Sequence, residues 1–167
     1  MAATPRRAAA RAGSSARTRF LGVLQRALGP LPEGAVAADI GTGSGVGAVW
    51  MAHAGIATHV LGGDVNPAAL RLCTVNAVLS DVRVEPVASD MFEHLPLLDL
   101  AICNPPYLVD DAGRAYRDGG GALGLDLALR FIHEGLPRLR SHGTLVLYTG
   151  VPIRASGVDP LRAARVG

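Results

Sequence analysis

The chain has 167 residues, of which 49% are hydrophobic and 4% aromatic, enough for one domain with a buried core and too few for two ordinary domains. Its apolar runs are strand-sized and broken by glycine or aspartate, which excludes a membrane span. The net charge of +2 is unevenly spread: from Phe20 onward 11 arginines face 14 acids. The expected folded part is therefore mildly acidic, which disfavours a protein that grips a phosphate backbone.

Residues 1–17 are rich in alanine and arginine and contain no acid. We interpret them as a disordered basic tail, with an organelle transit peptide or a nucleic-acid-binding arm as alternatives, and expect one domain over residues 18–167. Cys73 and Cys103 fall in separate expected elements without metal-ligand spacing. We therefore expect buried free thiols of a reducing cytoplasm, with a disulfide as the alternative, and no metal site.

Hydrophobic periodicity and turn signals divide the rest of the chain into alternating helices and strands. The expected elements are a helix over 18–28, a strand over 35–40, a helix over 44–55, a strand over 58–64, a helix over 66–80, strands over 82–89 and 97–104, a helix over 125–139 and a strand over 143–150. Asn66 and Pro67 give the third helix an N-cap and a first residue. The pattern predicts an α/β fold: a doubly wound, Rossmann-like parallel sheet of five strands in a three-layer α/β/α arrangement.

The first four expected strands each end in an unusual group of residues. The first runs into the loop Asp39–Gly47, the second ends at Asp64, the third ends at Ser89-Asp90, and the fourth runs into Asn104–Tyr107. Right-handed crossovers bring the carboxyl ends of parallel strands to one edge, where such sheets bind ligands. We therefore expect these groups to form a single site.

The loop "DIGTGSGVG" allows tight turns and close approach of a ligand to the backbone. One reading is a dinucleotide site with a pyrophosphate at the helix N-terminus, because Gly43, Gly45 and Ala48 match G-x-G-x-x-A and Asp64 follows Gly45 by 19 residues. Asp39 favours another ligand, since a carboxylate attracts an ammonium group and repels a pyrophosphate. A nicotinamide-dependent oxidoreductase also leaves the residues after the fourth strand unexplained.

The pattern Asp-x-Gly-x-Gly-x-Gly resembles the glycine loop of class I S-adenosylmethionine-dependent methyltransferases, where it cradles the amino-acid end of the cofactor. The resemblance implies that Asp64 hydrogen-bonds the ribose hydroxyls, that Asp90 accepts from the adenine amino group, and that Met91 or Phe92 covers the adenine ring. The cofactor-binding set that it implies is Asp39, Gly41, Thr42, Gly43, Gly45, Asp64, Val65, Ser89, Asp90, Met91, Phe92 and Asn104. A helix-capping role for Asp64 and a turn-forming role for Asp90 are the structural alternatives.

The tetrapeptide "NPPY", residues Asn104, Pro105, Pro106 and Tyr107, resembles the signature of methyltransferases that act on a planar nitrogen. The resemblance implies a catalytic role: the Asn104 side-chain oxygen and the Pro105 carbonyl accept from the substrate N–H groups and stabilise the charge that develops on nitrogen. Pro106 stiffens the turn, and Tyr107 stacks on the planar group or closes the pocket wall. The alternative is a strand-ending turn with no chemistry.

The run Asp118–Asp126, "DGGGALGLD", resembles the corresponding stretch of release-factor glutamine N5-methyltransferases, which are of the methyltransferase small-domain type. The likeness extends over about 37–150 and implies a cytoplasmic enzyme that uses S-adenosylmethionine to methylate a protein glutamine amide. Methylation of a ribosomal RNA or DNA base is the alternative substrate reading. Within this likeness we expect the glycine-rich loop 108–122 to fold over the substrate.

Two departures from that family are visible. The fold ordinarily ends in a β-hairpin beside strand five, but the residues after Gly150 are few and poor in strand formers. The family's N-terminal recognition domain also has no counterpart beyond one helix and the tail. A truncated chain, or one that needs a partner, is therefore an expectation, as is an exposed edge on strand five. The non-enzymatic alternative is a cofactor-binding subunit without catalytic activity. The sequence predicts no oligomeric state.

Overall fold

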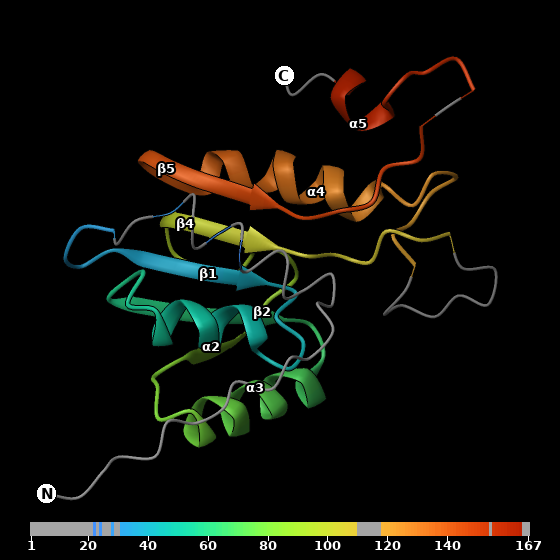
Figure 1. Ribbon diagram of the computed structural model, residues 1–167. Coiled ribbons are helices and arrows are strands. Elements are labelled where there is room, and N and C mark those ends of the chain that lie inside the picture. The colour runs from blue at the N-terminus through green and yellow to red at the C-terminus, as the bar shows by residue number, and fades with distance from the viewer. Residues whose placement is uncertain are drawn as a thin grey trace, which may run out of the picture.

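A computed structural model of the chain describes residues 22, 24, 28, 31–109, 118–153 and 155–164. Five strands form one sheet in the order β3-β2-β1-β4-β5, with every pair parallel (Figure 1). The strands are β1 (Val36–Ile40), β2 (His59–Asp64), β3 (Glu85–Ala88), β4 (Leu98–Cys103) and β5 (Leu139–Leu147). The predicted doubly wound parallel sheet is confirmed, and the strand order reverses between β1 and β4.

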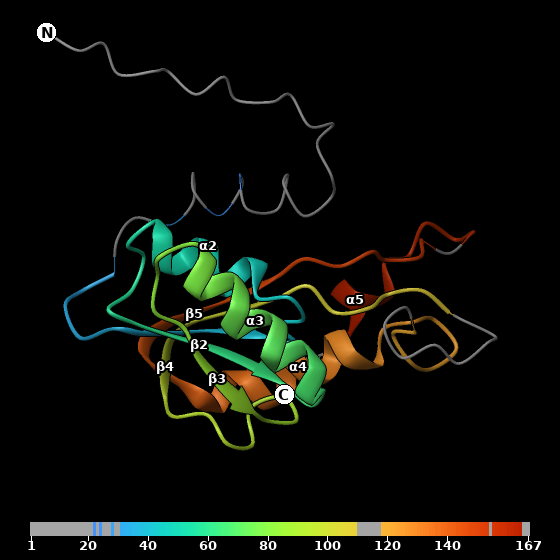
Figure 2. The same cartoon turned by 90° about the horizontal axis from the view of Figure 1, so that it is seen from below.

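Helices cover both faces of the sheet (Figures 1 and 2). They are α2 (Val46–His53), α3 (Pro67–Leu79) and α4 (Asp126–Gly135), which continues into the 3₁₀ turn η1 (Leu136–Arg138). The short α5 (Pro160–Ala163) lies beyond β5 rather than over a face of the sheet (Figure 1). Alternate strand residues face opposite layers: Ala37 packs in a cluster with residues of α2 and α3, whereas Ala38 packs in a second cluster with Phe131 of α4. The three-layer arrangement is thus confirmed.

The predicted start of α3 is also confirmed. The side-chain oxygen of Asn66 accepts from the Ala68 amide, with Pro67 as the first residue of α3. At the far end of α4 the chain tightens into η1, which contains Pro137. No helix in the described part of the chain is long and apolar enough to cross a bilayer.

The structure corrects the start of strand five. It begins at Leu139 rather than at residue 143, and its register with β4 is irregular between Leu98 and Leu100. Among residues 148–153 and 155–164 no further strand follows, so within the described residues β5 has a strand neighbour on one side only. The expected tail, 1–17, and most of the expected first helix lie outside the described residues, although Leu24 is helical and buried in the core.

Candidate active site at the carboxyl edge of the sheet

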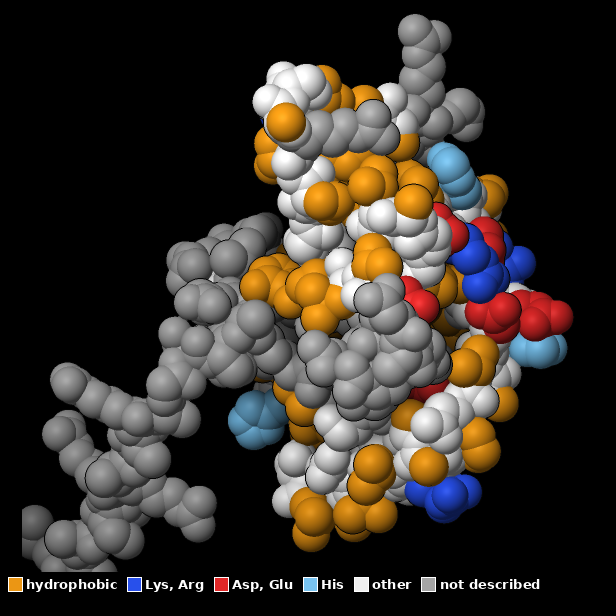
Figure 3. Space-filling view, turned by 90° about the vertical axis from the view of Figure 1, so that its right-hand side faces the viewer, with side chains coloured by type: hydrophobic (Ala, Val, Ile, Leu, Met, Phe, Trp, Pro, Cys, Tyr) orange, Lys and Arg blue, Asp and Glu red, His pale blue; other side chains and the backbone are white. Residues whose placement is uncertain are grey.

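The strand register brings the predicted segments together at one edge, which Figure 3 views directly. Ile40 at the end of β1 pairs with Gly63 of β2 on one side and with Cys103 of β4 on the other. Asp64 pairs with Ala88, the last residue of β3. The glycine loop, Asp64, the Ser89 turn and the Asn104 segment therefore all lie at the same edge. On this face the basic side chains in view lie toward the margins (Figure 3).

The glycine loop needs its glycines for two different reasons. Gly41 and Gly43 have φ values of 66° and 57°, and a Cβ added at either would meet no heavy atom within 4 Å. Gly45, the N-cap of α2 at φ 83°, is instead packed so closely that a Cβ would lie 2.7 Å from the Cys73 sulfur of α3. The first two glycines thus leave bare backbone facing open space, and the third lets two helices approach each other.

Asp39 holds the glycine loop from inside. Its carboxylate is 7% exposed, and Oδ2 accepts from the Thr42 hydroxyl at 2.9 Å and from the Ala48 amide at 3.1 Å. Ala48 lies in the first turn of α2, where backbone amides favour a negative charge. Asp39 therefore ties the end of β1 to the start of α2, a role that sequence reasoning missed. Its predicted role toward the cofactor ammonium group stays a prediction.

Asp64 connects the loop to the start of α3. Oδ2 accepts from the Gly43 amide at 2.9 Å and Oδ1 from the Asn66 amide at 2.8 Å. The half-buried carboxylate is thus fixed in orientation by two backbone amides, and each of its oxygens can still accept a further hydrogen bond. Val65 beside it is 69% exposed. The sequence indicated this acid, and the structure adds the two amides that orient it.

Ser89 fixes the turn after β3. It is buried, its hydroxyl donates to the Met91 carbonyl at 3.1 Å, and the same oxygen accepts from the His94 amide at 3.1 Å. Phe92 is 2% exposed and stacks on Phe131 in the core, whereas Met91 is only half-buried. Phe92 therefore lies beneath the site. Of the two residues predicted to cover the adenine ring, Met91 is the one nearer the surface.

Asn104 carries the most unusual polar atom of the site. Its Oδ1 is buried and has no hydrogen-bond partner in the part of the chain that the structure describes. Buried polar groups are nearly always paired, and an unpaired one costs about 1–3 kcal/mol. Asn104 follows β4, the strand that pairs with β1, and so lies beside the glycine loop. An acceptor at this position is therefore available to a donor that the described residues do not supply.

The backbone after Asn104 is tightly packed by glycines from later segments. A Cβ on Gly150 would lie 2.6 Å from the Tyr107 ring, one on Gly119 2.8 Å from the Pro106 carbonyl, and one on Gly124 2.8 Å from the Tyr107 carbonyl. The glycine-rich run therefore packs against the tetrapeptide and fixes its shape. Of the loop predicted to fold over the substrate, residues 110–117 lie outside the described residues.

The two thiols near the site are not nucleophiles. Both cysteines are free and buried, as predicted, and the disulfide alternative is wrong. Burial raises the pKa of Cys103 well above its usual value of 9.0, with Asp39 adding to the shift. Burial also raises the pKa of Cys73, against a hydrogen bond with Thr42 that lowers it. The thiolate is the reactive form, so these side chains serve packing. No metal-binding group of side chains occurs among the described residues.

The profile of the methyltransferase small domain family matches residues 20–156, most of the chain. The chain belongs to this family. A release factor glutamine methyltransferase of Cereibacter sphaeroides is 36% identical over 127 residues, covering 67% of this chain and 45% of that protein. A Methanocaldococcus jannaschii protein, named provisionally as a protein N5-glutamine methyltransferase, is 34% identical over 115 residues, covering 65% of this chain and 57% of its own. The chain thus spans about half the length of both relatives.

This small-domain methyltransferase chain is also similar to a solved structure. The T. thermophilus 16S rRNA N2 G1207 methyltransferase, in complex with AdoMet and guanosine, has a TM-score of 0.64 and 26% identity. The match covers 83% of this chain and 35% of that one. The resemblance to small-domain methyltransferases predicted from the sequence is confirmed.

The residues present in this chain fit S-adenosylmethionine. Gly41 and Gly43 offer bare backbone beside open space, and the carboxylates of Asp64 and Asp90 supply the acceptors that hydroxyl and amino donors need. The unpaired Oδ1 of Asn104 lies at the same edge.

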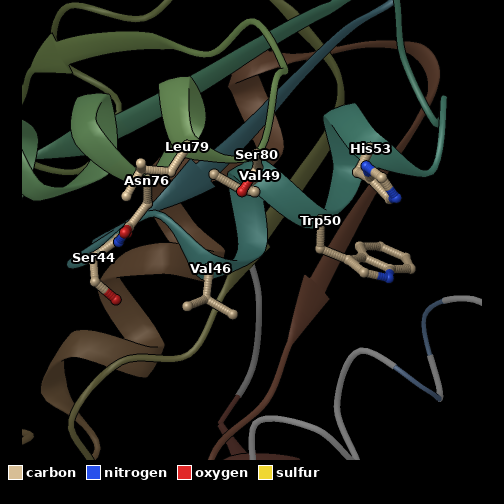
Figure 4. Close-up of a pocket in the computed structure, with 8 residues that line it drawn as sticks. All are labelled: Ser44, Val46, Val49, Trp50, His53, Asn76, Leu79 and Ser80. Atoms are coloured by element: carbon tan, nitrogen blue, oxygen red, sulfur yellow. The ribbon is translucent and has the colours of Figure 1, made fainter. Parts of the chain in front are cut away.

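A pocket outside this edge cluster lies between α2 and α3 (Figure 4). Its volume is about 590 Å³, and it is lined by Ser44, Val46, Val49, Trp50, His53, Asn76, Leu79 and Ser80. The Asn76 amide donates to the Ser44 carbonyl at 2.8 Å, which ties α3 to the glycine loop. None of the predicted site residues lines this pocket. A ligand that binds in this pocket can therefore be distinguished from one that binds at the carboxyl edge of the sheet.

Proposed function

We propose that this chain binds S-adenosylmethionine at the carboxyl edge of its sheet and methylates a planar amide nitrogen, namely a protein glutamine side chain. The observation that carries the proposal is the buried, unpaired Oδ1 of Asn104 beside the glycine loop. A substrate amide N–H is a donor that satisfies this atom. Asn104, Pro105, Pro106 and Tyr107 are the proposed catalytic segment.

The cofactor's role is to supply an electrophilic methyl group on a sulfonium. The chain's residues hold it in this proposal through the backbone at Gly41 and Gly43, the carboxylate of Asp64 at the ribose, and Asp90 with Met91 at the adenine. Thr42, Gly45, Val65 and Ser89 shape the same surface, with Asp39 inside the loop and Phe92 beneath the turn.

Asn104 acts in this proposal by accepting from the substrate N–H. An amide nitrogen is a poor nucleophile because its lone pair is delocalised into the carbonyl. An acceptor aimed at its hydrogens favours a pyramidal nitrogen and stabilises the positive charge that forms as the methyl group arrives. The Pro105 carbonyl is the second proposed acceptor, and the glycine packing around Pro106 and Tyr107 keeps the turn rigid. Proton loss to water then completes the reaction without a dedicated base.

The choice of glutamine is supported by the curated relatives and by charge. Both relatives named above carry glutamine methyltransferase names. The chain from Phe20 onward is mildly acidic, with 11 arginines against 14 acids, and among the described residues in view at the carboxyl edge the basic side chains lie toward the margins (Figure 3). A base N-methyltransferase is the second candidate, favoured by the likeness to the ribosomal RNA enzyme with guanosine bound.

Transfer of a labelled methyl group tests the proposal. The chain is incubated with labelled S-adenosylmethionine and either release factor or ribosomal RNA, and the modified residue is found by mass spectrometry. We expect label on a glutamine, and about 10²- to 10³-fold less with Asn104→Ala, the usual cost of one lost charge-stabilising group. Label on RNA selects the second candidate, binding without transfer selects the non-catalytic subunit, and equal transfer by Asn104→Ala refutes the role of Asn104.

A further inference from the structure

Helix α4 is joined to the turn after β3 by two neighbouring side chains. Phe131 stacks on Phe92 in the core, with ring centroids 5.5 Å apart. One residue earlier, the Arg130 Nη1 donates to Asp90 Oδ1 at 3.2 Å. The same turn is held from below by Ser89, whose hydroxyl bridges the Met91 carbonyl and the His94 amide. Both the backbone and the side chain of Asp90 are therefore held in place.

Arg130 is itself held on its other side. Its Nε donates to Glu134 Oε1 at 2.8 Å, one helical turn further along α4. These two carboxylates raise the pKa of Arg130, so its charge is permanent. The guanidinium engages only one oxygen of Asp90: Oδ2 accepts no hydrogen bond from any residue that the structure describes. One carboxylate oxygen is thus anchored, and the other is left for an outside donor.

We infer that Arg130 positions Asp90 for the adenine amino group and so sets a preference of the cofactor site for adenine over hypoxanthine. This inference rests on the proposed function. A guanidinium has only donors, so it cannot itself accept from the amino group, and Asp90 is the acceptor at this turn. Hypoxanthine carries a carbonyl oxygen in place of that amino group, and two acceptors facing each other repel. Anchoring Oδ1 keeps Oδ2 in the discriminating position.

The effect is modest because both side chains are partly exposed, 42% for Arg130 and 54% for Asp90. Exposed ion pairs contribute little, so loss of Arg130 should reduce discrimination by about two- to fivefold rather than abolish it. The effect should also shrink as salt is raised. Loss of Asp90 itself should remove the discrimination entirely.

The chain offers a matched control at the opposite edge of the sheet. Arg140 Nη1 donates to Asp99 Oδ2 at 3.1 Å, and the Arg140 side chain is 44% exposed, close to the 42% of Arg130, while Asp99 is more buried than Asp90, at 23% against 54%. Arg140→Gln therefore removes an arginine–aspartate contact of the same kind without touching the proposed cofactor site. A general loss of stability should appear in both variants alike.

The experiment measures dissociation constants of S-adenosylhomocysteine and S-inosylhomocysteine by calorimetry for the parent, Arg130→Gln, Arg130→Lys, Asp90→Asn, Arg140→Gln and the double variant Arg130→Gln/Asp90→Asn. We expect the ratio of the two constants to fall in Arg130→Gln, to recover in part in Arg130→Lys, and to equal the parent value in Arg140→Gln. In the Asp90→Asn background, Arg130→Gln should have no further effect on the ratio.

Failure of this inference is distinct from failure of the proposed function. A parent chain that binds neither ligand refutes the cofactor site and with it the inference. A parent that binds S-adenosylhomocysteine, together with an unchanged or raised ratio in Arg130→Gln, leaves the cofactor site standing and overturns the inference. An equal effect of Arg130→Gln with and without Asp90 also overturns it, because Arg130 would then contact the base directly.

Discussion

At the scale of single residues, the site contains a buried polar atom that lowers the stability of the fold. The Asn104 side chain buries Oδ1 without a partner in the described chain, directly after a strand whose side chains are buried. Such an unfavourable group is typical of functional sites, where a bound ligand supplies the missing hydrogen bond. The nearby glycines follow the same logic, since Gly41 and Gly43 leave space that any other side chain would fill.

A stability measurement on Asn104 tests this directly. Removing a buried unpaired acceptor relieves an unfavourable desolvation of about 1–3 kcal/mol. We therefore expect Asn104→Ala to melt no lower than the parent in thermal denaturation while losing methyl transfer. Asn104→Asp, which keeps an acceptor oxygen, should retain more transfer than the alanine variant. A large drop in melting temperature for Asn104→Ala would mean that the side chain is structural.

Gly41 allows a paired test of the open backbone. Gly41 and Gly55 have φ values of 66° and 64°, and a Cβ at either would meet nothing within 4 Å. Alanine at either position should cost roughly 1–2 kcal/mol of unfolding free energy, because both adopt the left-handed conformation. Only Gly41→Ala should also weaken S-adenosylhomocysteine binding in calorimetry. Equal binding by both variants would remove the loop from the cofactor site.

At the scale of elements, the burial of β4 has a consequence for alkaline stability. The pKa of Cys103 is raised by burial, so the folded chain holds this proton at pH values where the unfolded chain releases it. Stability from this group is therefore complete below the unfolded pKa of 9.0 and falls as the pH rises above it.

We accordingly expect the unfolding free energy of the parent to decline above about pH 9 by up to roughly 1.4 kcal/mol per pH unit for this thiol. Cys103→Val should decline less steeply over the same range, because it has no proton to lose. Urea denaturation at several pH values measures both slopes. Parallel slopes would show that Cys103 ionises equally in the folded and unfolded chain.

The elements also show where sequence reasoning stops. The ends of the first two strands, at Ile40 and Asp64, and the Asn66 cap follow from local pattern, and the structure confirms them. Phe92 was offered as a ring cover beside Met91, yet it lies in the core because Phe131 of α4 stacks on it. That contact joins residues 39 positions apart, a separation that no local pattern encodes. The early start of β5 at Leu139 has a similar cause, since its irregular register is set by β4.

At the scale of the whole molecule, the site exists because the strand order reverses between β1 and β4. That reversal sets the glycine loop beside Asn104, and the outer strands add Asp64 and the Ser89 turn. The alternation of strands and helices was enough to predict this convergence. The contacts that stiffen the site, such as Asp39 with Ala48 and Gly150 with Tyr107, depend on three-dimensional packing and were not predictable.

The most direct measurement is an amide NMR titration of the chain with S-adenosylhomocysteine. We expect the backbone signals of Gly41 and Gly43 and the side-chain amide signals of Asn104 to shift together along one binding curve. The indole signal of Trp50 in the α2–α3 pocket should move little. Shifts confined to Trp50 and its pocket neighbours, with Gly41 and Asn104 unmoved, would contradict the proposed site.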